Sequence, residues 1–414
     1  MKIWNFLAGM LLRIFAAIAV GVLLLTLVYA IPTQTIDRNV ARSATVIETE
    51  GAYPELTHLA TSYLDNWTDS IMLLEAAWSG PEPTLEKALQ AYRVGSGEDI
   101  PSESLVRYYR DGVYDRRVSY PQYWHGYQTL LKPLLLLTDY SHIRILNGLM
   151  QQLLALTVAL LLWRRGLGVY IPAWLVSIAM LMPWALAKSL QYSSCFYLMS
   201  IGALGALILD PGQKKQALYG LLWLGIATAY FDFLTYPIVT FAIPVTVWQM
   251  RQSVTRAWET LRRFLIRLLV WGSGYGLMWV GKIAAGTLLT EADHIGAAAD
   301  HMTRWFGGEH WFSVCYVFYF NVRDFVYTPV SFAAMLLMAV LLYHFFRRSP
   351  GKALKSPVFW ETALSYGLIC LLPFAWYLVL WNPSGLHHFF TNKSCEAAAF
   401  GGLCFLTRVS RLEP

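Results

Sequence analysis

Long apolar segments recur along this chain, and one wide polar stretch interrupts them near the start. Residues 7–31 are apolar and long enough to span a bilayer, whose hydrocarbon core takes about 20 residues of helix. Residues 32–141 are mostly polar, and apolar segments then return almost to the end. These continuous segments predict transmembrane helices, because a β-barrel would show short alternating segments instead.

The composition agrees with a chain that lies largely in lipid. Hydrophobic residues make up 56% and charged residues 14% of the chain, whereas about a quarter of a soluble domain is charged. The net charge of +6 gives no support to nucleic-acid binding, because the basic residues cluster at predicted helix ends. The sequence therefore predicts an all-α polytopic membrane protein of the cell membrane.

Basic clusters at alternate helix ends give the predicted topology. Arg164-Arg165, Lys214-Lys215 and Arg347-Arg348 all fall on one side, which the positive-inside rule makes cytoplasmic. Both termini are then cytoplasmic. We expect about ten transmembrane helices, at residues 7–31, 145–163, 169–187, 193–209, 218–230, 234–250, 268–289, 330–346, 359–381 and 394–406.

This topology divides the chain into five regions. They are a first transmembrane helix (1–31), an extracytoplasmic loop domain (32–141), transmembrane helices 2–7 (142–289), a second extracytoplasmic loop (290–327), and transmembrane helices 8–10 with an outer loop at 382–393 (328–414). Within the loop domain, periodic apolar residues predict helices at 53–77, 84–92 and 102–109, and an interfacial helix within 120–137. The sequence shows no internal repeat of the kind seen in many transporters.

Three segments resemble the C-type glycosyltransferase superfold (GT-C), membrane enzymes that take a sugar from a polyprenyl phosphate. Ile36-Asp37-Arg38-Asn39 follows the first span, where the family keeps a catalytic acidic residue. Residues 123–134 and 143–147 look like the family's aromatic, Pro-Leu and Arg-Leu sequence before the second span. Residues 386–393 are similar to the polar loop that closes over the lipid phosphate. The chain also looks like a group of uncharacterised bacterial polytopic membrane proteins, through residues 64–69 and 232–237.

The resemblance implies an inverting glycosyltransferase that works at the extracytoplasmic face. Its donor would be a polyprenyl-phosphate sugar held among membrane lipid, and its acceptor an envelope polysaccharide or glycolipid. Two other classes stay open at this point: a flippase or transporter for lipid-linked sugars, and a non-catalytic envelope assembly protein.

An inverting transfer needs a carboxylate to take a proton from the acceptor hydroxyl. Asp37 is the first candidate for this catalytic base, with Glu50 and its neighbour Glu48 as rivals. The alternative interpretation makes Asp37 a helix cap or the partner of Arg38 or Arg42. The adjacent acidic pair that is common in the superfold is absent here, because Arg38 follows Asp37 directly.

Cationic groups are needed as well, because they stabilise the departing phosphate. The predicted donor-binding cations lie near the outer ends of helices or in outer loops: Lys188, Lys282, Arg304 and Lys393. Lys282 lies inside an apolar helix, where an ammonium is either functional or snorkels to the interface.

The remaining predicted substrate-binding residues are polar groups of the outer loops: Asp65, Asp69, His125, His387 and His388. Asp65 and Asp69 are four apart, so on one helix they share a face and could bind acceptor hydroxyls or a divalent ion, or form a solvated stripe. His294 and His301 are too far apart along a helix for one metal ion. We expect no metal site and no cofactor.

Overall fold

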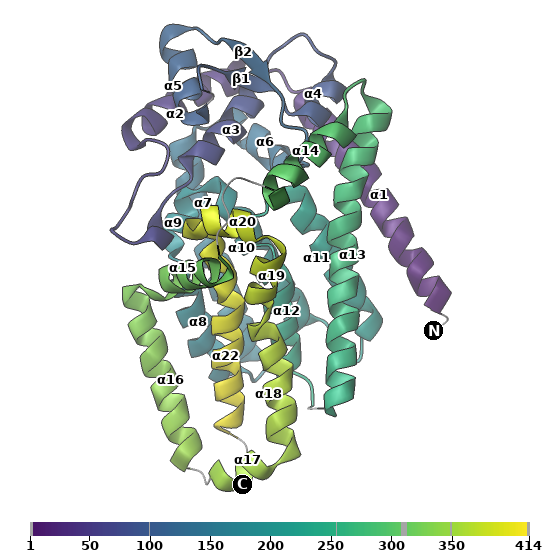
Figure 1. Ribbon diagram of the computed structural model, residues 1–414, viewed down its shortest axis with the longest axis vertical. Coiled ribbons are helices and arrows are strands. Elements are labelled where there is room, and N and C mark those ends of the chain that lie inside the picture. Colours follow the sequence, from purple (N-terminus) through teal and green to yellow (C-terminus); the bar gives the residue numbers. More distant parts are fainter. Residues whose placement is uncertain (1–2, 99, 254, 308–312, 348–349, 412–414) are drawn as a thin grey trace.

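Long apolar helices form the body of the molecule, and a smaller helical domain covers one end of it (Figure 1). We call this domain the ectodomain after the location that the sequence predicts for it. The computed structural model describes residues 3–98, 100–253, 255–307, 313–347 and 350–411. In these residues, six helical segments are long and apolar enough to cross a membrane: Ile3–Tyr29, Tyr140–Arg164, Leu190–Ile208, Ala257–Leu289, Pro329–Arg347 and Pro357–Val379. The chain therefore has the architecture expected of an all-α polytopic membrane protein.

The bundle contains these six segments and several shorter helices. In chain order its elements are α1 (Ile3–Tyr29), α7 (Tyr140–Arg164), η2 (Gly168–Tyr170), α8 (Ile171–Met180), α9 (Pro183–Lys188), α10 (Leu190–Ile208), α11 (Lys214–Phe231), α12 (Val239–Met250), α13 (Ala257–Leu289), α14 (His294–Gly307), α15 (Val314–Val326), α16 (Pro329–Arg347), α17 (Pro350–Lys355), α18 (Pro357–Cys370), α19 (Leu372–Val379), α20 (Trp381–Leu386), α21 (His388–Thr391), η3 (Asn392–Cys395) and α22 (Glu396–Val409).

Six of the ten predicted spans coincide with a helix that is long and apolar enough to cross a membrane. Helix α11 has 18 residues but begins with Lys214-Lys215 and is less apolar, and the other three predicted spans are short or broken. The predicted span at 169–187 is interrupted at Met182, whose backbone is left-handed (φ 55°), and Pro183 then begins a new helix. Helix α12 has 12 residues, so its length of about 18 Å is less than the hydrocarbon core. All of its residues are buried among other helices, which accounts for its apolar sequence.

The ectodomain lies between α1 and α7. Its elements are α2 (Gln34–Glu50), η1 (Ala60–Ser62), α3 (Asn66–Ala77), α4 (Thr84–Gln90), β1 (Arg93–Gly95), α5 (Pro101–Asp111), β2 (Arg116–Val118) and α6 (Gln128–Leu137). The two short strands pair antiparallel, with Arg93 opposite Val118. Helix α2 is amphipathic and buries Ile36, Val40, Ala44 and Ile47 against α3, α5 and α6.

Two predicted ectodomain helices begin later than the sequence pattern indicated. The helix expected over 53–77 starts only at Asn66, because the Asp65 side chain caps it by accepting from the Thr68 amide at 2.9 Å. The helix expected within 120–137 starts at Gln128. His125 precedes it in a left-handed conformation (φ 55°), and Gly126 donates its amide to the Tyr230 carbonyl at 2.9 Å. Tertiary contacts override the apolar periodicity in both segments.

The ectodomain core extends into the bundle through the turn between α11 and α12. Phe233 of this turn is buried against three ectodomain rings, with centroid distances of 4.9 Å to Tyr123, 5.0 Å to Tyr127 and 5.2 Å to His125. The next residue, Leu234, is left-handed (φ 63°). The two parts of the molecule are thus packed as one body at this junction.

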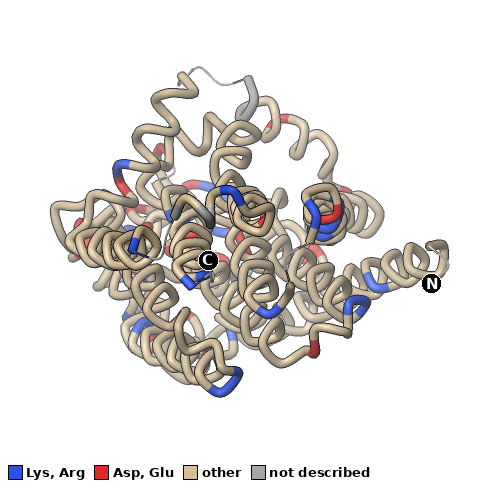
Figure 2. Tube along the Cα trace, turned by 90° about the horizontal axis from the view of Figure 1, so that it is seen from below, with Lys and Arg blue, Asp and Glu red and all other residues tan. Residues whose placement is uncertain are grey.

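Helices α11 and α13 approach each other through glycines. A Cβ atom added to Gly225 would lie 2.1 Å from the Trp271 carbonyl oxygen, and one added to Gly274 would lie 2.4 Å from that of Leu222. Small residues that let backbones meet are typical of helix pairs in membranes. Figure 2 looks along the bundle from the end opposite the ectodomain, where Lys and Arg segments surround the C-terminus.

Candidate functional site

Helix α3 carries acidic side chains through the centre of the ectodomain. Asp65 and Asp69 lie at its first turns and Glu75 near its end, and all three are buried. Asp65 accepts hydrogen bonds at 2.9 Å from both the amide and the hydroxyl of Thr68. Buried carboxylates must be hydrogen-bonded or paired, so the surroundings of each one indicate its role.

Asp69 links α3 to the start of α10. Its two oxygens accept from the backbone amides of Leu190 (2.9 Å) and Gln191 (3.1 Å). Amides at the N-terminus of a helix have no hydrogen-bond partner within the helix, so the carboxylate supplies one here. The Tyr140 hydroxyl also donates to it through a short hydrogen bond. Burial raises the pKa of Asp65 to about 7 and that of Asp69 to about 6.

Glu50 and Arg144 form an ion pair beside this carboxylate. Arg144 donates Nη1 to both Glu50 oxygens at 2.8 and 2.9 Å, and Nη2 at 2.8 Å to Asn66 Oδ1 and to the Tyr140 hydroxyl. The Arg144 side chain is 6% exposed and that of Glu50 is 26% exposed. We call Glu50, Asn66, Asp69, Tyr140 and Arg144 the arginine cluster. Its hydrogen bonds connect α2, α3, α7 and α10, so the cluster holds these four helices together.

A second buried group surrounds Glu75, which the sequence analysis did not select. The Tyr127 hydroxyl donates to Glu75 Oε2 at 2.6 Å, and His125 Nδ1 lies 3.0 Å from the same oxygen. The other ring nitrogen of His125 is 2.6 Å from the Tyr120 carbonyl oxygen. His125 is therefore enclosed, and its ring does not face an open surface where a substrate could bind, contrary to the prediction from the sequence. The available signal for Glu75 was a single carboxylate inside the apolar residues 71–77.

Several predicted residues lie apart from one another. Asp37 accepts from the Tyr109 hydroxyl at 2.7 Å in the first turn of α2, while Glu50 ends that helix. Thirteen residues of helix separate them by about 20 Å, so the two carboxylates do not share one site. Lys188 contributes its carbonyl near Tyr140 (3.5 Å), but its side chain is exposed.

The predicted cations are also separated. Lys282 is buried and donates to the Leu89 carbonyl at 2.5 Å, so it joins α13 to the ectodomain at α4. Arg304 lies in α14, and its side chain is outside the described residues. His294 contacts Gln90 at 3.0 Å. Among the described residues, no group of three or more His, Cys, Asp or Glu side chains could hold a metal ion.

The predicted last outer loop, residues 382–393, packs against the ectodomain through three contacts. Lys393 is buried and donates to the Thr61 carbonyl at 3.0 Å, while Asn392 accepts from the Thr61 hydroxyl at 3.2 Å. Phe389 packs on Tyr53 with a centroid distance of 5.5 Å. Burial lowers the pKa of Lys393 to about 7 and that of His387 to about 4.

An open site occurs where this loop meets α15. The His388 side chain, 23% exposed, pairs through Nδ1 with Asp324, which is 3% exposed. Arg323 donates Nε and Nη2 to the same carboxylate at 2.7 and 2.5 Å. A carboxylate on one ring nitrogen of histidine fixes the tautomer and orients the opposite nitrogen as a proton acceptor. This histidine–aspartate dyad can therefore act as a general base.

Arg323 also lines an apolar groove of about 750 Å³ between α15, α16 and the ectodomain. The groove is lined by Leu59, Tyr319, Val322, Arg323, Val326, Tyr327, Thr328, Pro329, Ser331, Phe332 and Met335. Exposed apolar side chains such as Phe332 and Met335 continue it along α16. The groove thus offers one cation beside an apolar surface. Helix α15 and the start of α16, which line it, lie toward the end of the bundle that bears the ectodomain (Figure 1).

The apolar helices and the helical ectodomain define the class of this chain as an all-α membrane protein. No protein-family model, no curated protein and no solved structure matches the chain.

Proposed function

We propose that the protein is a membrane glycosyltransferase that moves a sugar from a polyprenyl phosphate to an envelope glycan or glycolipid at the extracytoplasmic face. The observation that carries the proposal is the apolar groove beside Arg323 with the Asp324–His388 dyad next to it. A polyprenyl chain needs an apolar surface, its phosphate needs a cation, and the acceptor hydroxyl needs a base.

In this proposal the residues act as follows. The prenyl chain lies against Phe332 and Met335 of α16. Arg323 binds the phosphate through the guanidinium N–H groups that do not donate to Asp324. The acceptor oxygen forms a bond to the anomeric carbon as the bond from that carbon to the phosphate oxygen breaks. His388 takes the hydroxyl proton through Nε2, and polyprenyl phosphate leaves with the bonding electrons.

This assignment moves the base from the ectodomain carboxylates to the last outer loop. Glu50 is paired with Arg144, and Asp37 accepts from Tyr109, whereas His388 pairs with the carboxylate that also holds the groove cation Arg323. Residues 386–393 remain the segment of resemblance on which the assignment depends. Asp65, Asp69 and Lys393 then position the loop domain and are not in contact with substrate.

The test is sugar transfer by the purified full chain in nanodiscs, with a panel of radiolabelled polyprenyl-phosphate sugars and a membrane extract as acceptor. We expect His388→Gln to lower transfer by about 10²–10⁴-fold, the contribution of a general base. His142→Gln is the matched control, because His142 forms a similar pair with Asp139 at 2.9 Å in an exposed position. Equal transfer by both variants would remove His388 as base. Donor that crosses the membrane unchanged would favour transport instead.

A further inference from the structure

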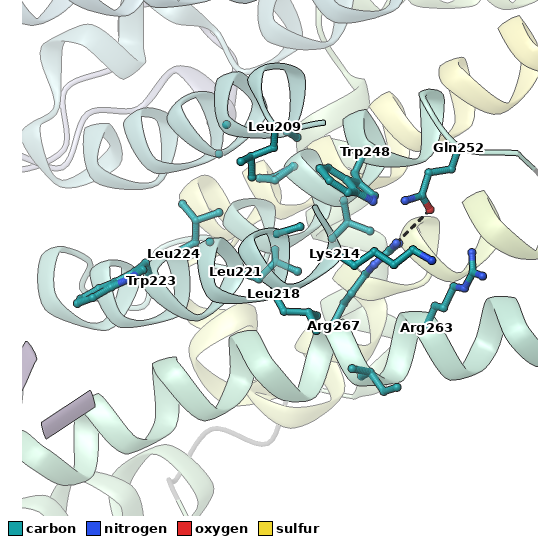
Figure 3. Close-up of a pocket in the computed structure, with 18 of the residues that line it drawn as sticks. Leu209, Lys214, Leu218, Leu221, Trp223, Leu224, Trp248, Gln252, Arg263 and Arg267 are labelled. Atoms are coloured by element: carbon teal, nitrogen blue, oxygen red, sulfur yellow. Dashed lines mark hydrogen bonds between the residues drawn. The ribbon is translucent and has the colours of Figure 1, made fainter. Parts of the chain in front are cut away.

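A second groove lies at the opposite end of the bundle, and the function proposed above does not use it. It has a volume of about 540 Å³, within the range of about 300–1,000 Å³ found for small-molecule sites. Helices α10, α11, α12 and α13 line it. Figure 3 shows its two ends: Trp223 and Leu224 lie at one, while Lys214, Gln252, Arg263 and Arg267 gather at the other.

The two ends differ in chemistry. The apolar part is lined by leucines of α10 and α11 together with Pro244 and Trp248 of α12. The other end holds four cations, Lys214, Arg262, Arg263 and Arg267, and one carboxylate, Glu259. Glu259 accepts from Arg262 at 3.0 Å and from Arg263 at 2.8 Å, and Arg267 donates to Gln252 at 3.2 Å. A net positive charge therefore faces this end of the groove.

The length of the groove matches one leaflet of a bilayer. Along α11 the lining runs from Lys214 to Ala227, thirteen residues or about 20 Å of helix. Half of the hydrocarbon core is about 15 Å, so this distance spans one leaflet and part of the headgroup layer. The cations then lie at headgroup depth and the leucines at acyl-chain depth.

We propose that this groove binds one phospholipid with an anionic headgroup, from the leaflet at the basic end of the bundle. The acyl chain lies between α10, α11 and α13, and the phosphate contacts Lys214, Arg263 and Arg267. Charge complementarity selects this occupant: a zwitterionic lipid fills the apolar part equally well, but its own ammonium cancels the charge of its phosphate and leaves the net positive charge of the groove uncompensated.

Two glycines allow the apolar part to be tested without disturbing the fold. A Cβ atom added to Gly205 or Gly220 meets nothing within 4 Å, and both residues line the groove. Gly220→Leu therefore fills the groove from α11. Gly276→Leu is the matched control, because Gly276 has the same open surroundings on α13 but does not line the groove.

The cations are tested by a second pair of variants. Lys214→Gln with Arg263→Gln removes two charges from the groove. Lys215→Gln with Arg164→Gln removes two charges at the same end of the bundle from residues that do not line it. The second pair therefore reports any general effect of lowering the positive charge.

Lipid binding is measured by native mass spectrometry of the full chain, titrated with dioleoyl phosphatidylglycerol or dioleoyl phosphatidylcholine. We expect the wild type to prefer phosphatidylglycerol, and Lys214→Gln with Arg263→Gln to weaken its binding by about tenfold. Gly220→Leu should weaken the binding of both lipids, and the two controls should behave as wild type.

The proposal is overturned if the wild type binds both lipids equally, or if the groove variants match their controls. It is overturned as well if glycerol 3-phosphate displaces the phospholipid at similar concentration, because the site would then bind a free anion. Sugar transfer is a separate readout, so failure here leaves the proposed transferase function untouched.

Discussion

The arginine cluster makes a quantitative prediction about stability. Arg144→Met keeps the aliphatic stem but removes four hydrogen bonds, two to Glu50 and one each to Asn66 and Tyr140. Removing one partner of a buried ion pair costs about 3–5 kcal/mol, because the other charge is left without compensation. Glu50 is 26% exposed and can recruit water, so we expect the lower end, about 3 kcal/mol.

The free energy of unfolding is measured by titrating the purified protein in mixed micelles with dodecyl sulfate. Arg110→Met is the matched control, since Arg110 pairs with Glu48 at 3.4 Å and both side chains are exposed. We expect no measurable change for it. Glu50→Gln added to Arg144→Met should recover part of the loss, because the uncompensated carboxylate is gone. A loss below about 1 kcal/mol in Arg144→Met would refute the role of the cluster as a connection.

Further predictions concern helix packing and pH. Gly274→Ala should lose about 1–3 kcal/mol, because the new Cβ atom would lie 2.4 Å from the Leu222 carbonyl oxygen, while Gly276→Ala meets open space and should lose none; equal dodecyl sulfate midpoints would contradict this. The pKa of Asp65 is raised to about 7, so the folded state binds its proton more tightly than the unfolded state does. The free energy of unfolding should therefore fall as the pH rises from about 4 to about 7. Asp65→Asn keeps the helix cap and should reduce that fall. If the variant has the same pH profile of unfolding free energy as the wild type, the prediction is wrong. The lowered pKa of Lys393, about 7, has the opposite sign: the unfolded state binds more protons, so stability should rise from about pH 7 to pH 10, and Lys393→Met should flatten that rise.

Composition and long apolar segments sufficed to predict the helical membrane class and a separate stretch of shorter helices after the first long helix. The signal was strong because lipid demands long apolar segments, and six of these formed helices of spanning length. The same signal failed for α12 and for the helices within 169–187, because buried helices of a large bundle are as apolar as lipid-facing ones.

The sequence predicted only part of the candidate site. His387, His388 and Lys393 were selected, and they do lie in the outer loop that packs against the ectodomain. Asp324 and Arg323 were not selected, because an adjacent arginine and aspartate in the predicted loop at 290–327 form no recognisable motif. Pairing of residues 324 and 388 is a long-range contact that local periodicity does not encode.

The Phe233 contact has a consequence for how the protein is made. The domain between α1 and α7 is synthesised early, but three of its aromatic rings pack on Phe233, which is translated about a hundred residues later. The partners of Thr61 are synthesised even later, because Asn392 and Lys393 lie near the end of the chain. The domain between α1 and α7 thus stays incomplete until residues 392–393 have been synthesised, and products that end before them leave part of its packing surface uncovered.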